Sequence, residues 1–174
     1  MNVQATPTER AEPRPGDDLV SPADIVMDRG FTLDAPPETV WPWLAQLGKH
    51  RAGWYLPRRV ERILPPRNRA LRHLDPQWTT LHVGDVIPDY GGRDETFEVA
   101  AIDLPHALVY TSRRGHTHVS WSITLRPIDA RTRVLLRLRM APVKHRTLAG
   151  TIGELIDYAT IAGMAAGLRE RLMS

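Results

Sequence analysis

The sequence predicts an α+β fold in which helices gather on one face of a curved antiparallel sheet. Two observations carry this prediction. Four consecutive strand-like segments joined by short turns fill residues 95–140, and a continuous helical pattern covers residues 146–172. A run of strands followed by one long helix is typical of a sheet whose apolar face is covered by that helix.

Residues 1–20 are polar, contain three prolines and show no hydrophobic periodicity, so we expect a disordered tail there. Two arginines and four carboxylates give this tail a net charge of −2. The whole chain carries +3, which leaves +5 on residues 21–174, where we place the single folded domain. That charge favours anionic partners but is too low to predict nucleic-acid binding.

The folded part begins with a strand over Ile25–Leu33, whose apolar residues fall on odd positions. A proline-initiated short helix follows and ends at Gly48. Its apolar face carries Val40, Trp41, Leu44 and Leu47. Within residues 49–80, Arg58–Leu64 predicts a second short helix, and Val86–Pro88 then predicts a short strand.

Four longer strands complete the predicted sheet. They are expected at Glu95–Ile102, His106–Ser112, Thr117–Leu125 and Thr132–Met140. In the last two strands apolar residues alternate with serine, threonine and arginine, which predicts a sheet that is wet on its second face. Four-residue turns between the strands would place Tyr110 opposite Val119 and Trp121 opposite Leu136.

The C-terminal helix has two apolar faces. One face carries Ile152, Leu155, Ile156 and Ala159. The opposite face carries Ile161, Met164, Ala165, Leu168 and Leu172. Glycines in this helix, such as Gly163 and Gly167, are expected to leave space beneath it, and space between a helix and a sheet forms a cavity.

Composition excludes several classes of protein. The chain has no cysteine, which excludes disulfides, thiolate metal centres and a thiol nucleophile. It has no apolar run of ~18 residues, no apolar signal segment at its start and no phosphate-binding glycine motif. We therefore expect a cytoplasmic protein without a transmembrane segment.

Several segments resemble one family. They are APPETVWPWLAQLGKHRAGWY (residues 35–55), Gln77-Trp78, Val83-Gly84-Asp85, Leu108-Val109-Tyr110, Val119-Ser120-Trp121 and Thr132-Arg133-Val134. Together they resemble a bacterial branch of the SRPBCC or START-like superfamily, which includes polyketide cyclases and dehydrases and lipid-transfer domains. The resemblance spans residues 21–174. It implies the helix-grip fold, a curved antiparallel sheet wrapped around a long C-terminal helix with an apolar cavity between them, and it supplies no catalytic residue.

The candidate site is this cavity. Its lining is expected from the strands and the last helix, at Tyr110, Val119, Trp121, Leu136, Ile152, Ile156 and Met164. Aromatic residues are expected at its mouth, at Trp54, Tyr55, Trp78 and Tyr90. Aromatic rings with polar tips suit an apolar pocket that orients a ligand. The alternative for each residue is that it only fills the core.

Other candidate chemistries are weaker. His116 and His118 share a strand face, but no third ligand is near in sequence, so no metal is predicted. Acid–base chemistry would need an inward-facing carboxylate among the candidates Asp94, Glu95 and Glu98, with Tyr110 as a further donor. The six arginines of residues 58–73, and those on the second face of the sheet, are interpreted as solvated surface.

The sequence therefore predicts a carrier or sensor that binds a small hydrophobic or aromatic molecule, such as a lipid, polyketide or isoprenoid, without a cofactor. The first alternative is a polyketide cyclase- or dehydrase-type enzyme that uses the same cavity. The second is an interaction module, in which the helix face bearing Ile161 and Met164 is exposed and binds a protein partner. A monomer or weak homodimer is expected.

Overall fold

The computed structural model describes residues 2–143 and 146–173, and for residues 146–152 it describes the backbone alone. Six strands form one antiparallel sheet in the order β1-β6-β5-β4-β3-β2. The strands are β1 Ile25–Leu33, β2 Val86–Pro88, β3 Thr96–Asp103, β4 Ala107–Arg114, β5 Thr117–Ile128 and β6 Arg131–Ala141. The predicted α+β class and antiparallel sheet are confirmed.

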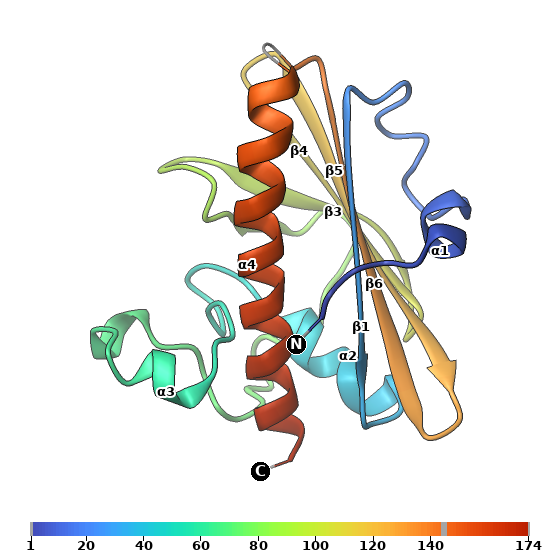
Figure 1. Cartoon of the computed structure of the whole chain (residues 1–174). Helices are drawn as coiled ribbons and strands as arrows, with labels where there is room; N and C mark the ends of the chain where they lie inside the picture. Colours follow the sequence, from blue (N-terminus) through green and yellow to red (C-terminus); the bar gives the residue numbers. More distant parts are fainter. Residues whose placement is uncertain (1, 144–145, 174) are drawn as a thin grey trace.

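One long helix lies along the sheet. The helices are α1 Pro7–Ala11, α2 Pro37–Gln46, α3 Arg58–Glu61, the 3-10 turn η1 Pro66–Asn68 and α4 Arg146–Leu172. Figure 1 shows α4 against one side of the sheet, here called the inner face, and α2 near one end of the sheet. This is the helix-grip arrangement that the sequence resemblance implies. Within the described residues no helix has the length and hydropathy that a membrane crossing requires.

The two hairpins are tighter than predicted. Each turn has two residues instead of four, with a positive φ at Gly115 (61°) and at Asp129 (52°). Trp121 therefore pairs with Tyr110 on one side and with Leu138 on the other. The predicted pairs were wrong by two residues. Because side chains alternate with a period of two, this slip left every residue on its predicted face.

The helix α4 buries the apolar face that carries Ile161 and Met164, and it exposes Ile156, which was expected to line the cavity with Met164. Ile161, Met164 and Leu168 are buried against the sheet, whereas Ile156 is exposed. The predictions that Ile156 faces a cavity and that the Ile161 face is free for a partner are therefore wrong. A second correction concerns Gly167: a Cβ there would lie 2.6 Å from the backbone nitrogen of Leu56. The glycine admits a neighbouring loop and leaves no empty space.

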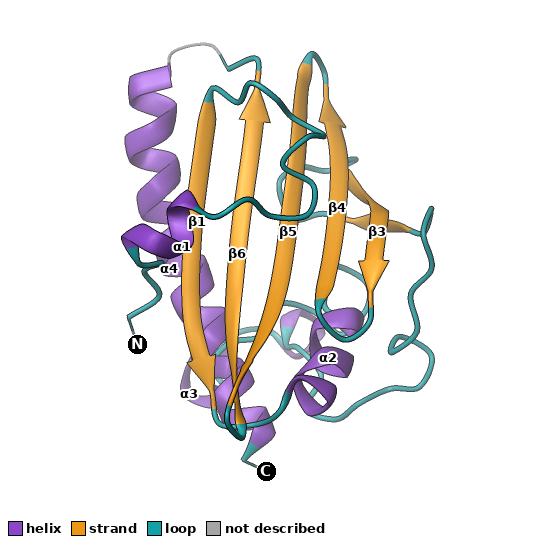
Figure 2. Cartoon of the chain, turned by 90° about the vertical axis from the view of Figure 1, so that its right-hand side faces the viewer, coloured by secondary structure: helices purple, strands orange, loops and turns teal. Residues whose placement is uncertain are grey.

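The N-terminal segment (residues 2–20) is ordered in the structure, where a disordered tail was predicted. Figure 2 shows it crossing the second face of the sheet, here called the outer face. Its first residues lie beside β1, where the Gly30 amide donates to the Val3 carbonyl at 2.9 Å and Val3 is fully buried. Thr6 and Glu9 form a capping box that starts α1.

Ion pairs hold this segment on the outer face. Arg133 Nε donates to Glu9 Oε1 at 2.8 Å, and Arg137 Nη1 donates to Asp17 Oδ2 at 2.8 Å. Arg137 also contacts Asp28 of β1 at 2.8 Å and is buried. The predicted wet face is thus covered, because the acidic segment matches the arginines of β6. Composition alone does not report such a long-range match.

Candidate ligand-binding site

Stacked aromatic rings form a cluster on the inner face. The Tyr110 and Trp121 rings lie on neighbouring strands, with centroids 5.6 Å apart and planes 20° apart. Trp54, from the loop after α2, stacks on Trp121 at 6.3 Å. Phe97 of β3 contacts both Tyr110 and Trp121 at 5.9 Å. The cluster therefore joins the sheet to the loop at residues 47–57.

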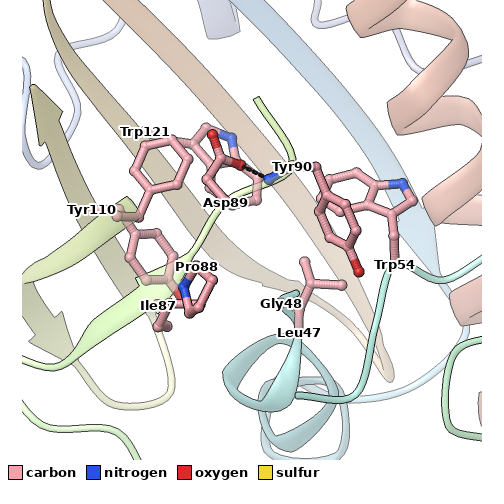
Figure 3. Close-up of a pocket in the computed structure, with 10 residues that line it drawn as sticks. Leu47, Gly48, Trp54, Ile87, Pro88, Asp89, Tyr90, Tyr110 and Trp121 are labelled. Carbon is pink, nitrogen blue, oxygen red and sulfur yellow. Dashed lines mark hydrogen bonds between the residues drawn. The ribbon is translucent and has the colours of Figure 1, made fainter. Parts of the chain in front are cut away.

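A small pocket opens within this cluster, here called the aromatic pocket. Its lining residues come from the loop after α2, from β2 and the loop after it, and from β3, β4 and β5: Leu47, Gly48, Trp54, Ile87, Pro88, Asp89, Tyr90, Phe97, Tyr110 and Trp121. Figure 3 shows these side chains, with Tyr90 beside Trp54. The pocket volume is about 30 Å³, which is room for about one or two water molecules. In this conformation the aromatic side chains pack against one another and leave no room for a larger ligand.

Polar groups at the pocket are few and mostly engaged. Burial raises the pKa of the Tyr110 phenol, so this hydroxyl stays protonated and is a hydrogen-bond donor. Asp89 is a carboxylate in the lining, and it accepts hydrogen bonds from Arg114 and from the Tyr90 amide. Asp89 therefore fixes the loop at residues 88–95, because each of its two carboxylate oxygens already accepts one hydrogen bond.

Four of the predicted site residues meet in the pocket: Trp54, Tyr90, Tyr110 and Trp121. The alternation of apolar residues along the strands predicted the inner-face position of Tyr110 and Trp121. The lining residues that sequence reasoning missed are Leu47, Gly48, Ile87, Pro88, Asp89 and Phe97. Phe97 carried a usable signal, because it alternates with Val99 in β3 and the chain has only two phenylalanines. The others depend on how the loops fold back.

The two remaining mouth candidates lie elsewhere. Tyr55 is fully buried, and its hydroxyl donates to the Trp43 carbonyl at 2.7 Å. The Arg171 guanidinium lies 4.5 Å from the centre of the Tyr55 ring. Trp78 instead packs beneath Arg51, whose guanidinium is 5.0 Å from the indole centre. Tyr55 is thus a core residue, and its placement at a mouth was wrong.

The other lining candidates separate in the same way. Val119, Leu136 and Met164 are buried on the inner face and on α4, outside the aromatic pocket. The side chain of Ile152 lies outside the part of the chain whose side chains are described. Val119, Leu136 and Met164 thus belong to the buried core.

The carboxylates named from sequence do not face the pocket. Asp94 and Glu98 are exposed, and Glu95 is half-buried near Arg114. A carboxylate that sequence reasoning missed, Asp157 of α4, does point toward the sheet and contacts the Arg29 guanidinium of β1 at 2.8 Å. Burial raises the pKa of Asp157, while Arg29 opposes that shift. This ion pair lies apart from the aromatic pocket lining.

The comparisons with known proteins establish the fold. No protein-family model matches the chain, and no curated protein matches its sequence. Solved structures do. A protein from Mesorhizobium loti matches with a TM-score of 0.52 and 18% identity, over 86% of this chain and 97% of that chain. An HSP90 activator from Plasmodium falciparum matches with a TM-score of 0.57 and 14% identity, over 86% and 96%.

A third neighbour comes from a biosynthetic locus. DynU16, a putative protein in the dynemicin biosynthetic locus, matches with a TM-score of 0.53 and 14% identity. The match covers 88% of this chain and 48% of that chain. At such identities the likeness concerns the fold, which hosts different activities in different proteins.

Proposed function

We propose that this chain binds a small apolar or aromatic molecule, such as a lipid, polyketide or isoprenoid, in the aromatic pocket, as a ligand-binding member of the SRPBCC or START-like superfamily. The observation that carries the proposal is the stack of Trp54, Trp121 and Tyr110 across three segments. Flat ring faces at a pocket are the surface on which an aromatic or polyene ligand stacks.

Ligand binding requires the pocket to open. The Trp54 and Tyr90 rings meet edge to face at 6.2 Å, and Tyr90 is about half exposed. Both residues belong to loops, so they part more easily than Tyr110 and Trp121, which are fixed in the sheet. A ring that buries about 150 Å² of apolar surface gains ~4 kcal/mol, and this gain opposes the cost of separating these loops.

The lining favours binding over acid–base catalysis. Asp89 is the carboxylate in this pocket, and its two oxygens accept hydrogen bonds from Arg114 and from the Tyr90 amide. A cyclase or dehydrase needs a group that takes a proton from its substrate. Tyr110, with its raised pKa, donates a hydrogen bond and does not serve as a base near neutral pH. We therefore propose a carrier or sensor rather than an enzyme.

The test is a binding titration with N-phenyl-1-naphthylamine, a neutral aromatic probe that fluoresces in apolar sites. We expect wild-type protein to bind it, and Trp121→Ala to weaken binding about tenfold or more, because the ring on which the probe stacks is removed. The matched control is Ile123→Ala, on the same strand and face, fully buried and outside the pocket lining. Equal loss of affinity in both variants would contradict the proposal.

A further inference from the structure

A second hollow adjoins the aromatic pocket, here called the basic groove. It has a volume of about 500 Å³ and lies between the loop at residues 49–56 and the segment at residues 64–69. Trp54 and Tyr90 line both hollows. The two rings therefore form the wall between an apolar compartment and this larger open one.

The charged side chains that line the groove are all basic. Its ionisable lining residues besides Tyr90 are Lys49, His50, Arg51, Arg67 and Arg69, and no carboxylate lines it. Cationic side chains so close together repel one another and create a local positive potential. That potential attracts an anion of a size that fits the groove.

Several arginines outside the groove are paired with carboxylates, as Arg72 is with Glu61 and Arg114 with Asp89. In the groove, no described carboxylate lies within 4.0 Å of a lysine or arginine lining residue. Arg69 donates to the carbonyl of Leu64 at 2.9 Å, and Lys49 donates to the carbonyl of Gly92 at 3.2 Å. Backbone carbonyls hold these side chains in place without neutralising their charge.

Arg51 adds a further sign of an incomplete site. It donates to the carbonyls of Ala45 and Trp78 at 3.0 and 2.8 Å, and its buried Nε has no hydrogen-bond partner within the described residues. Desolvation lowers the pKa of this guanidinium. A buried donor without a partner is costly, and the residue that carries it lines the groove.

We propose that the ligand is an amphipathic anion, whose apolar or aromatic body enters the aromatic pocket and whose carboxylate, phosphate or sulfonate group lies in the basic groove beside Trp54 and Tyr90. This inference rests on the function proposed above and narrows its ligand class. Neutral isoprenoids and hydrocarbons leave the groove unpaired, so they bind more weakly than their acidic derivatives. Arg67 and Arg69, on the exposed side of the groove, contact the anionic group.

The experiment compares two probes with the same aromatic body. 8-Anilinonaphthalene-1-sulfonate carries an anion, and N-phenyl-1-naphthylamine does not. We expect wild-type protein to bind the sulfonate more tightly, by about three- to tenfold at low salt, and this preference to shrink as salt is added. The double variant Arg67→Gln/Arg69→Gln should lose the preference while its affinity for the neutral probe stays unchanged.

The control removes two charges from residues that come shortly before this segment in the chain and lie outside the groove. Arg59→Gln/Arg62→Gln lies on exposed residues that do not line it. It should keep the preference for the sulfonate. Equal loss in both double variants overturns the inference, because the preference would then report net charge alone.

The remaining outcomes separate this inference from the proposed function. Binding of both probes with equal affinity overturns the anion site and leaves the aromatic pocket standing. Binding of neither probe overturns both. Displacement of the sulfonate by equimolar inorganic phosphate also overturns the inference, because the groove would then hold an anion without needing the apolar body.

Discussion

Gly167 shows how one residue decides the way α4 meets the rest of the chain. A Cβ at this position would lie 2.6 Å from the backbone nitrogen and 2.8 Å from the carbonyl carbon and oxygen of Leu56. Leu56 belongs to the loop that carries Trp54 and lines the basic groove. The missing side chain therefore sets the position of both hollows, although Gly167 lines neither.

We expect Gly167→Ala to lower the free energy of unfolding by up to about 2 kcal/mol. Alanine gains ~1 kcal/mol of helix propensity over glycine. The Leu56 backbone, however, cannot rotate away from the new methyl group as a side chain can. Overpacking of this kind costs ~1–3 kcal/mol. Chemical denaturation measures the change. The control is Gly153→Ala in the same helix, where the nearest atom is the flexible Met27 methyl at 3.0 Å. There stability should stay equal or rise, and equal losses would contradict this account.

At the scale of elements, the N-terminal segment is a covering layer held by charge. Glu9 is one of its contacts with β6, because Arg133 donates two hydrogen bonds to this carboxylate, at 2.8 and 2.9 Å. The hydrogen bonds from Arg133 lead the interactions that hold the pKa of Glu9 at about 2, against an ordinary 4.5. Because the pKa of Glu9 is lower in the docked state than its ordinary value, the ionised carboxylate stabilises docking at pH values above 4.5.

We therefore expect docking to weaken as the pH falls from 4.5 toward 2, where Glu9 takes up a proton. An NMR titration of the Glu9 side chain should give a midpoint near 2. The variant Arg133→Gln should return that midpoint toward 4.5 and loosen the segment, seen as faster hydrogen exchange of the Gly30 amide that donates to Val3. A wild-type midpoint near 4.5 would contradict the described ion pair.

Local patterns predicted the elements and missed what depends on distant partners. The alternation around Val119 and Trp121 gave the strand and its inner face, since side-chain direction follows from neighbouring residues. It did not give the pairing of Trp121, because a two-residue slip keeps the same face. The order of residues 2–20 depends on arginines more than 100 residues away, such as Arg133, and no local signal reports them.

At the scale of the whole molecule, the fold brings sheet rings and loop rings together at one place. Tyr110 and Trp121 come from adjacent strands, Trp54 from the loop after α2, and Tyr90 from the loop after β2. Sequence reasoning named these four residues because aromatic side chains stand out in such segments. It misplaced Tyr55 and Ile156, because the phase of a loop or a helix against the core is fixed only by the assembled contacts.

The central claim is that a ligand binds in the aromatic pocket against Trp54 and Trp121, and the five tryptophans of the chain allow a direct test. The measurement is an NMR titration of the indole N–H signals, assigned by single Trp→Phe variants, with N-phenyl-1-naphthylamine as the ligand. We expect the signals of Trp54 and Trp121 to shift and those of Trp41, Trp43 and Trp78, which lie outside the pocket lining, to stay in place. Shifts confined to the latter three, or no shift at all, would contradict the assignment of the binding site.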